Sequence, residues 1–187
     1  MIGWLPESAK FFQGLLDEDG RTVDRQRARG CPSCGGRLDR ADYPRKPRGL
    51  PDRWEGLFDR RFSLCCCREG CRRRVTPPSV RFLGRRVYAG AVVLLGAAVP
   101  VLVAIALCGV ARCTVARWAA WWTEALPQSA FWRVARARLM PPLDEARLPA
   151  ELLVRFLGDR DDALFKALVF IAPITAAPRS SSFPMGP

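Results

Sequence analysis

The chain has 187 residues, of which 49% are apolar, so it can bury a core and is not disordered throughout. Lys and Arg number 30 against 18 Asp and Glu, and the resulting net charge of +12 favours nucleic acid as a partner, with a merely solvated surface as the alternative. The chain has no histidine, which excludes Ser-His-Asp and Cys-His catalytic groups and zinc held by imidazole.

Residues 1–30 predict a helix followed by a basic linker. Apolar side chains recur at helical spacing within residues 7–17: Phe11, Phe12, Leu15 and Leu16. We expect Asp19 and Gly20 to end that helix. Residues 1–7 lack a basic segment followed by an apolar one, so no secretory signal is predicted and a cytoplasmic, nucleoid-associated location is expected. Eight cysteines in a reducing compartment indicate metal binding rather than disulfides.

Residues 31–80 predict a small zinc ribbon with short β-hairpins. Cys31 and Cys34 form a CxxC knuckle, which can bring two sulfurs to one tetrahedral metal ion. Gly35 follows the second cysteine and lets backbone amides turn toward the thiolates. With four thiolates the ion has no open position for water, so we expect structural Zn²⁺. Free thiols beside a chance CxxC are the alternative.

Four cysteines compete for the two remaining ligand positions: Cys65, Cys66, Cys67 and Cys71. Phe62 and Leu64 have the spacing of the inward face of a short strand, and this alternation places Cys66 on the same face. Cys66 and Cys71 are therefore the favoured ligands, and Cys65 and Cys67 remain possible substitutes. Arginines follow this knuckle and are expected to hold DNA phosphates: Arg72, Arg73, Arg74, Arg85 and Arg86.

Residues 87–111 carry no charge and are long enough to span a bilayer, so a small membrane protein with a cytoplasmic zinc ribbon is one alternative. Pro100 and three glycines interrupt the run. We therefore favour two buried helices, the first ending near Ala98 and the second beginning around Pro100.

Residues 81–126 predict a helix-turn-helix, in which Gly109 ends the first helix in a left-handed conformation. The second helix is expected from Arg112 to about Ala125. Its inward positions would be Val110, Val115 and Trp118, and its outward positions Arg112, Cys113, Ala116 and Arg117. Of these, Arg112 and Arg117 are the candidates for DNA contacts.

Residues 127–171 predict further helices, over about 131–140 and 149–171, with Pro127 breaking the preceding one. Residues 172–187 are rich in Pro and Ser and are expected to be disordered. The acidic residues between 144 and 162 are scattered, and too few residues remain for an RNase H-like catalytic domain, so no enzyme is predicted.

Four stretches carry a family resemblance: residues 41–49, 61–66, 70–74 and 76–88. They resemble a group of short bacterial proteins labelled transposase-like, which have an N-terminal zinc ribbon followed by a helix-turn-helix. The second helix of that group is matched at Gly109, Val110, Arg112, Thr114, Arg117 and Trp118. Ala111 stands where the group has a capping serine, and Cys113 where it has arginine. The resemblance covers roughly residues 10–140 and implies association with mobile elements.

The expected fold class is α+β, mostly α, with a four-cysteine zinc ribbon followed by a helical helix-turn-helix region. The expected function is zinc-dependent, non-catalytic DNA binding by an accessory or truncated transposase relative. Double-stranded DNA is the expected partner, with a transposase or self-association as a further one. A zinc-ribbon protein–protein adaptor is the other alternative.

Overall fold

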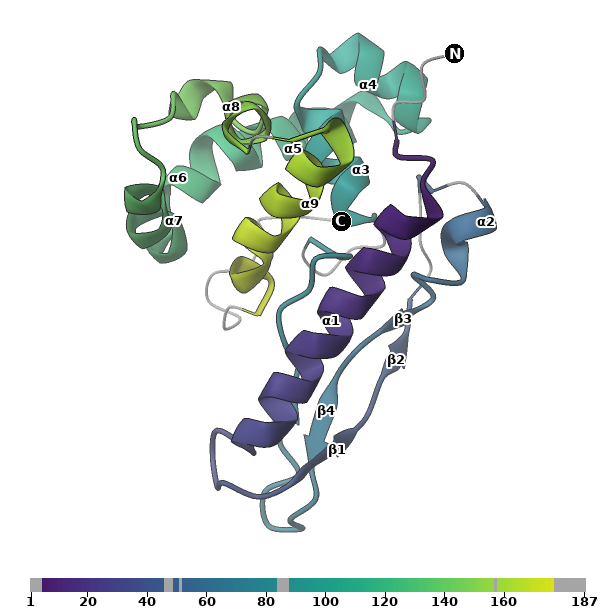
Figure 1. Cartoon of the computed structure of the whole chain (residues 1–187), viewed down its shortest axis with the longest axis vertical. Coiled ribbons are helices and arrows are strands. Elements are labelled where there is room, and N and C mark those ends of the chain that lie inside the picture. Colours follow the sequence, from purple (N-terminus) through teal and green to yellow (C-terminus); the bar gives the residue numbers. More distant parts are fainter. Residues whose placement is uncertain (1–4, 46–48, 51, 84–87, 157, 177–187) are drawn as a thin grey trace.

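Helix α1 (Ala9–Arg29) lies along a narrow β ribbon, and the remaining helices gather at one end of this pair (Figure 1). The computed structural model describes residues 5–45, 49–50, 52–83, 88–156 and 158–176. Helices dominate these residues, and the strands form two small antiparallel sheets. The α+β, mostly helical class predicted from the sequence is confirmed.

Helix α1 is longer than predicted, since it continues through Gly20 to Arg29. The Ser8 hydroxyl caps its start by accepting from the Phe11 amide. Beyond Gly20 the helical spacing of inward positions persists, and Val23 is buried. The predicted end at Asp19 and Gly20 is therefore wrong, because packing of the buried face outweighs the low helix propensity of one glycine.

Five short strands form the ribbon: β1 (Leu38–Arg40), β2 (Tyr43–Pro44), β3 (Arg60–Arg61), β4 (Leu64–Cys66) and β5 (Arg74–Val75). Strand β4 lies between β1 and β5, and both neighbours are antiparallel to it. Strands β2 and β3 pair separately and extend the same two chain segments away from the cysteines. The short helix α2 (Asp52–Glu55) lies in the connection between β2 and β3.

The uncharged run folds into two short helices, α3 (Gly90–Ala97) and α4 (Val101–Cys108), with Pro100 directly before the second. Gly109 ends α4 with a φ of 61°, in the left-handed region. Both the division at Pro100 and the left-handed glycine agree with the sequence analysis. Within the described part of the chain, no helix combines the length and the apolar character needed to cross a membrane. The alternative membrane span of residues 87–111 would begin at residue 87, which lies outside the described residues.

The remaining helical segments are α5 (Arg112–Ala120), the π-helical η1 (Trp121–Ala125), α6 (Leu126–Gln128), α7 (Ala130–Ala135), the 3-10 turns η2 (Arg136–Arg138) and η3 (Glu145–Arg147), α8 (Ala150–Arg155), α9 (Arg160–Ile171) and the 3-10 turn η4 (Ala172–Ala176). Pro127 does not break the helix where predicted, because the wider turn of η1 accommodates it and Ser129 begins the next helix. The tryptophans Trp118, Trp122 and Trp132 are fully buried in the main core.

The start of the predicted disordered tail is ordered. Residues 172–176 form η4, in which Ala172 is buried. The Thr175 hydroxyl accepts a hydrogen bond from the Ser79 amide, at 2.8 Å, and so ties this segment to the chain that leaves the ribbon. That part of the prediction is wrong, and residues 177–187 lie outside the described chain.

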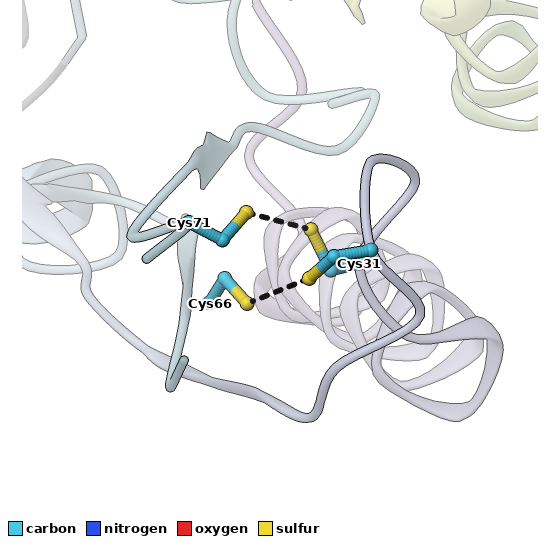
Figure 2. A group of neighbouring side chains, drawn as sticks. Cys31, Cys66 and Cys71 are labelled. Atoms are coloured by element: carbon cyan, nitrogen blue, oxygen red, sulfur yellow. Dashed lines mark hydrogen bonds between the residues drawn. The ribbon is translucent and has the colours of Figure 1, made fainter. Parts of the chain in front are cut away.

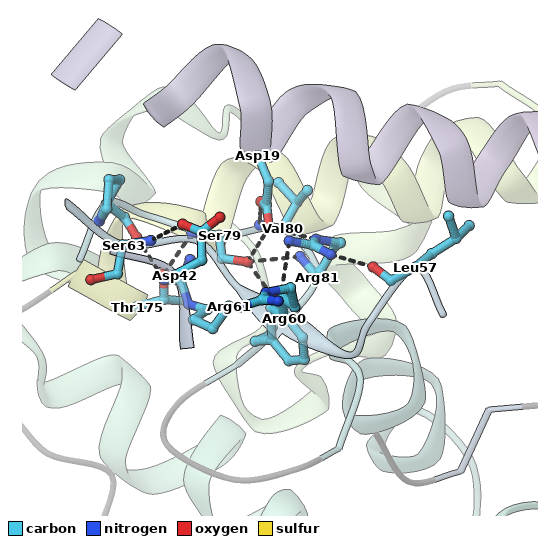
Figure 3. A network of polar contacts seen from close by, with 12 residues as sticks. Asp19, Asp42, Leu57, Arg60, Arg61, Ser63, Ser79, Val80, Arg81 and Thr175 are labelled. Carbon is cyan, nitrogen blue, oxygen red and sulfur yellow. Dashed lines mark hydrogen bonds and ion pairs between the residues drawn. The ribbon is translucent and has the colours of Figure 1, made fainter. Parts of the chain in front are cut away.

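A buried ion pair joins α1 to the segment after the ribbon (Figure 3). Asp19 and Arg81 are each 1% exposed, and the Arg81 Nε lies 2.8 Å from Asp19 Oδ2. The same carboxylate accepts the Ser79 hydroxyl at 2.6 Å and the Val80 amide at 2.8 Å. The other nitrogens of Arg81 donate to the carbonyls of Leu57 and Arg60, and its guanidinium lies over aromatic rings, the Phe62 centroid at 4.4 Å.

Because this charge pair is enclosed, removing one partner leaves the other without compensation. We expect Asp19→Asn to lower the free energy of unfolding by about 3–5 kcal/mol, measured by denaturant titration. Asp17→Asn, two residues earlier on the exposed face of α1, is the matched control and should stay within about 0.5 kcal/mol of the parent. Equal unfolding midpoints for the two variants would contradict the role assigned to Asp19.

Two glycines with open space around them should respond in opposite directions to alanine. Gly20 lies inside α1, so Gly20→Ala should raise the free energy of unfolding by about 0.4–1 kcal/mol. Gly109 has a left-handed backbone, so Gly109→Ala should lower it by about 1–2 kcal/mol. Denaturant titration of both variants checks this, and a destabilising Gly20→Ala would show that α1 is interrupted at Gly20.

Candidate metal centre

The first cysteine knuckle begins where α1 ends. Gly30, with a φ of 74°, turns the chain out of the helix, and a Cβ at this position would lie 3.0 Å from the Gly35 carbonyl oxygen. The Cys31 carbonyl accepts the Gly35 amide at 2.8 Å, and the Cys31 amide donates to the Gly36 carbonyl at 2.8 Å. These two bonds close the loop and direct the sulfurs of Cys31 and Cys34 to the same side.

The second knuckle lies at the end of β4. Cys66 is the last residue of that strand and is fully buried, and a tight turn brings the chain back to Cys71, whose amide donates to the Arg68 carbonyl at 3.0 Å. Arg72 has a φ of 43°, an uncommon conformation for a residue with a side chain, as the chain leaves the turn for β5.

The sulfurs of Cys31, Cys34, Cys66 and Cys71 all lie within 4.8 Å of one another. Figure 2 shows the side chains of Cys66 and Cys71 directed toward Cys31. The Sγ atoms of Cys31 and Cys71 are 3.7 Å apart, and those of Cys34 and Cys66 are 3.5 Å apart. A tetrahedral zinc–thiolate centre with bonds of about 2.3 Å has sulfur–sulfur edges of about 3.8 Å, whereas a disulfide bond is about 2.05 Å long. The four side chains thus fit one tetrahedral metal ion.

The neighbouring cysteines lie outside this group. Cys65 and Cys67 alternate with Cys66 and are half-buried, and the Cys65 thiol donates to the Arg72 carbonyl at 3.4 Å. The four sulfurs brought together are those favoured in the sequence analysis. That they ligate a metal stays a prediction.

The electrostatics of the four thiols favour a bound cation. The hydrogen bond from the Ser33 amide lowers the pKa of Cys31 to about 6, against the effect of burial. The hydrogen bond from the Arg68 amide also lowers the pKa of Cys66. Burial and the Cys34 and Cys31 thiols outweigh this bond and raise that pKa to about 12. The pKa of Cys71 is also raised, because contact with Cys34 and burial outweigh the hydrogen bond from the Arg73 amide. Cys66 and Cys71 thus resist ionisation, and a divalent cation would remove that obstacle by displacing their protons.

Two arginines link the knuckles across the cluster. Arg68 donates from the second knuckle to the Cys34 carbonyl at 3.1 Å, and its side chain lies over Gly36, where a Cβ would be 3.1 Å from it. Arg73 donates to the Ser33 hydroxyl at 2.7 Å. Sequence reasoning did not identify Arg68, and the sequence holds no signal for it, because its partner is 34 residues away. Four thiolates and one divalent ion would carry a net charge of −2, which these cations partly offset.

The arginines predicted to contact DNA do not converge. Arg72, Arg73 and Arg74 are exposed at the knuckles, whereas α5 lies near the opposite end of the longest axis of the molecule (Figure 1). On α5, Arg112 is exposed, and the Arg117 guanidinium lies along its own helix, donating to the Cys113 carbonyl and the Thr114 hydroxyl. Arg85 and Arg86 lie outside the described residues.

The carboxylates of the C-terminal half have local structural roles. Asp144 accepts the Ala146 amide at the start of η3, and Asp159 caps α9 by accepting the Asp162 amide. Glu145 accepts the indole N–H of Trp132 at 2.6 Å, and this bond holds its pKa below the usual value. Among the described residues, the four cysteines are the one group of three or more potential ligands close enough to hold an ion.

Comparison with protein-family models, with curated proteins and with solved structures finds no match to this chain.

Cys65 and Cys66, adjacent in β4, provide a matched test of the ligand set. After loading with zinc and dialysis, Cys65→Ser should retain one ion per chain, because Cys65 lies outside the sulfur group. Cys66→Ser should retain much less, since it removes one of the four sulfurs. Elemental analysis by plasma mass spectrometry measures both. Loss of zinc from Cys65→Ser together with retention by Cys66→Ser would reverse the assignment.

Proposed function

We propose that this chain is a zinc-dependent protein that binds double-stranded DNA without reacting with it. The observation that carries the proposal is the convergence of four cysteine sulfurs at tetrahedral spacing within an arginine-rich surface. Zinc in such a site supplies rigidity rather than catalysis, because four thiolates leave no position for water. The net charge of +12 favours a polyanion as the partner.

We also propose that α4 and α5 form a helix-turn-helix. Helix α4 ends at the left-handed Gly109, and α5 follows directly. Val110, Val115 and Trp118 are buried at 7%, 1% and 0% exposure, which is the inward set that a helix-turn-helix requires. Arg112 is exposed at the start of α5, whereas the guanidinium of Arg117 is bonded back to the same helix.

A relationship to the transposase-like group of bacterial proteins remains part of the proposal, supported by the ribbon motifs and by the second-helix pattern. In that setting the chain would act as an accessory or truncated, non-catalytic protein at mobile elements. The scattered carboxylates, most of them engaged in caps and side-chain hydrogen bonds, support the absence of a catalytic role.

A protein–protein adaptor is the second candidate, and the exposed apolar face of α4 favours it. Leu102 is 76% exposed, and Val103 and Leu107 are exposed beside it. Such side chains on one short helix are typical of a contact with another protein. A transposase or a second copy of this chain would then be the partner.

A salt titration of duplex binding tests the DNA proposal against the adaptor. We expect the zinc-loaded protein to bind a duplex of arbitrary sequence at low salt, and the logarithm of the association constant to fall linearly with the logarithm of salt concentration, by about 0.9 for each phosphate contacted. Fluorescence anisotropy with labelled duplex measures this. Removal of zinc with a chelator should abolish binding, because the arginine-bearing loops lose their fixed shape.

The adaptor hypothesis predicts a different result in this titration. Absence of measurable duplex affinity in dilute buffer, with zinc bound and the chain folded, would contradict DNA binding and leave the adaptor as the better account.

A further inference from the structure

The end of the molecule that carries the cysteines presents arginines from three separate segments. The last turns of α1 supply Arg27 and Arg29, the turn after Cys66 supplies Arg68, and the chain between that turn and β5 supplies Arg72 and Arg73. We name these five residues the knuckle-end arginines. All five are exposed. Because α1 continues past Gly20, its basic last turn reaches the metal centre.

Hydrogen bonds to β1 and to the first knuckle fix the positions of three of these side chains. Arg27 Nε donates to the Leu38 carbonyl at 3.4 Å, and Arg68 and Arg73 reach across to the Cys34 carbonyl and the Ser33 hydroxyl. Within the described part of the chain, none of the knuckle-end arginines forms an ion pair with a carboxylate. Their charge is therefore available to an external anion.

The opposite end of the molecule is less suited to phosphates. There α4 exposes Leu102, Val103 and Leu107. Next to it, α5 offers Arg112 as an exposed cation, whereas the Arg117 guanidinium is bonded back to its own helix. Apolar side chains offer a phosphate neither a positive charge nor a hydrogen-bond donor, which are the groups that hold a nucleic-acid backbone.

We propose that the knuckle-end arginines, rather than α5, form the phosphate-binding surface for nucleic acid, with the metal centre fixing their positions. This inference rests on the proposed DNA binding and locates it. It assigns phosphate contacts to Arg27, Arg29 and Arg68, which the sequence analysis did not select. Because the contacts come from a metal-stabilised end rather than from a helix in a groove, the surface recognises the backbone and is indifferent to sequence.

The test uses two knuckle-end arginines whose side chains have no hydrogen bond or ion pair within the described chain. The double variant Arg29→Gln, Arg72→Gln removes two charges and leaves the links made by Arg68 and Arg73 in place. Matched doubles remove the same charge elsewhere: Arg112→Gln, Arg117→Gln on α5, and Arg133→Gln, Arg138→Gln in α7 and η2. Zinc content and unfolding midpoint are measured for each variant before binding is compared.

Duplex affinity is measured by anisotropy over a range of salt concentrations. The knuckle-end double should lower the salt slope by about two, since each phosphate contact contributes roughly one, while both other doubles keep the parent slope. A lower salt slope in the α5 double, with the parent slope kept in the knuckle-end double, would overturn the inference and leave the proposed DNA binding intact. An equal decrease of the slope in both doubles would also overturn the inference. If the parent protein binds no duplex in dilute buffer, the proposed function itself fails.

Discussion

The convergence of four cysteine sulfurs at the end of α1 is the constraint on which the ribbon depends. The local core around it is small: Val23, Cys31, Leu38, Leu64 and Cys66. So few apolar side chains cannot by themselves order two loops and strands of two or three residues. A divalent ion would supply the missing free energy, because its bonds to the sulfurs form only in the folded chain and displace the thiol protons.

A second contact, the buried ion pair of Asp19 and Arg81, connects the ribbon to α1. The Asp19–Arg81 pair joins α1 to the chain that follows β5 (Figure 3). Arg81 also contacts the carbonyls of Leu57 and Arg60, so one guanidinium links α1, the β2–β3 connection and the segment that enters the helical core. Fixed at both points, α1 can hold its basic last turn beside the metal centre. The position of the arginine surface thus follows from the ion pair and the cysteine cluster, together with the packing of Phe11, Phe12 and Leu15 of α1 in the main core.

Local patterns sufficed to predict much of this arrangement. The CxxC spacing indicated the first knuckle, and strand alternation after Phe62 and Leu64 placed Cys66 rather than Cys65 with it. Pro100 and Gly109 divided the apolar run where the structure divides it. The failures have a common cause in long-range contacts. A carboxylate in a helix is ordinarily solvated, so nothing local shows that Asp19 is buried against a partner 62 residues away. The continuation of α1 past Gly20 has a local trace, the apolar Val23 at helical spacing, which the predicted end at Asp19 and Gly20 left out.

The coordination of the bound ion is the most direct test of this account, because both the rigidity of the ribbon and the placement of its arginines depend on it. X-ray absorption at the zinc edge of the purified full chain reports the identity, number and distance of the ligand atoms. The account predicts a single shell of four sulfur atoms at about 2.3 Å. A shell dominated by oxygen or nitrogen, or a folded chain whose four thiols remain free of metal, would contradict it.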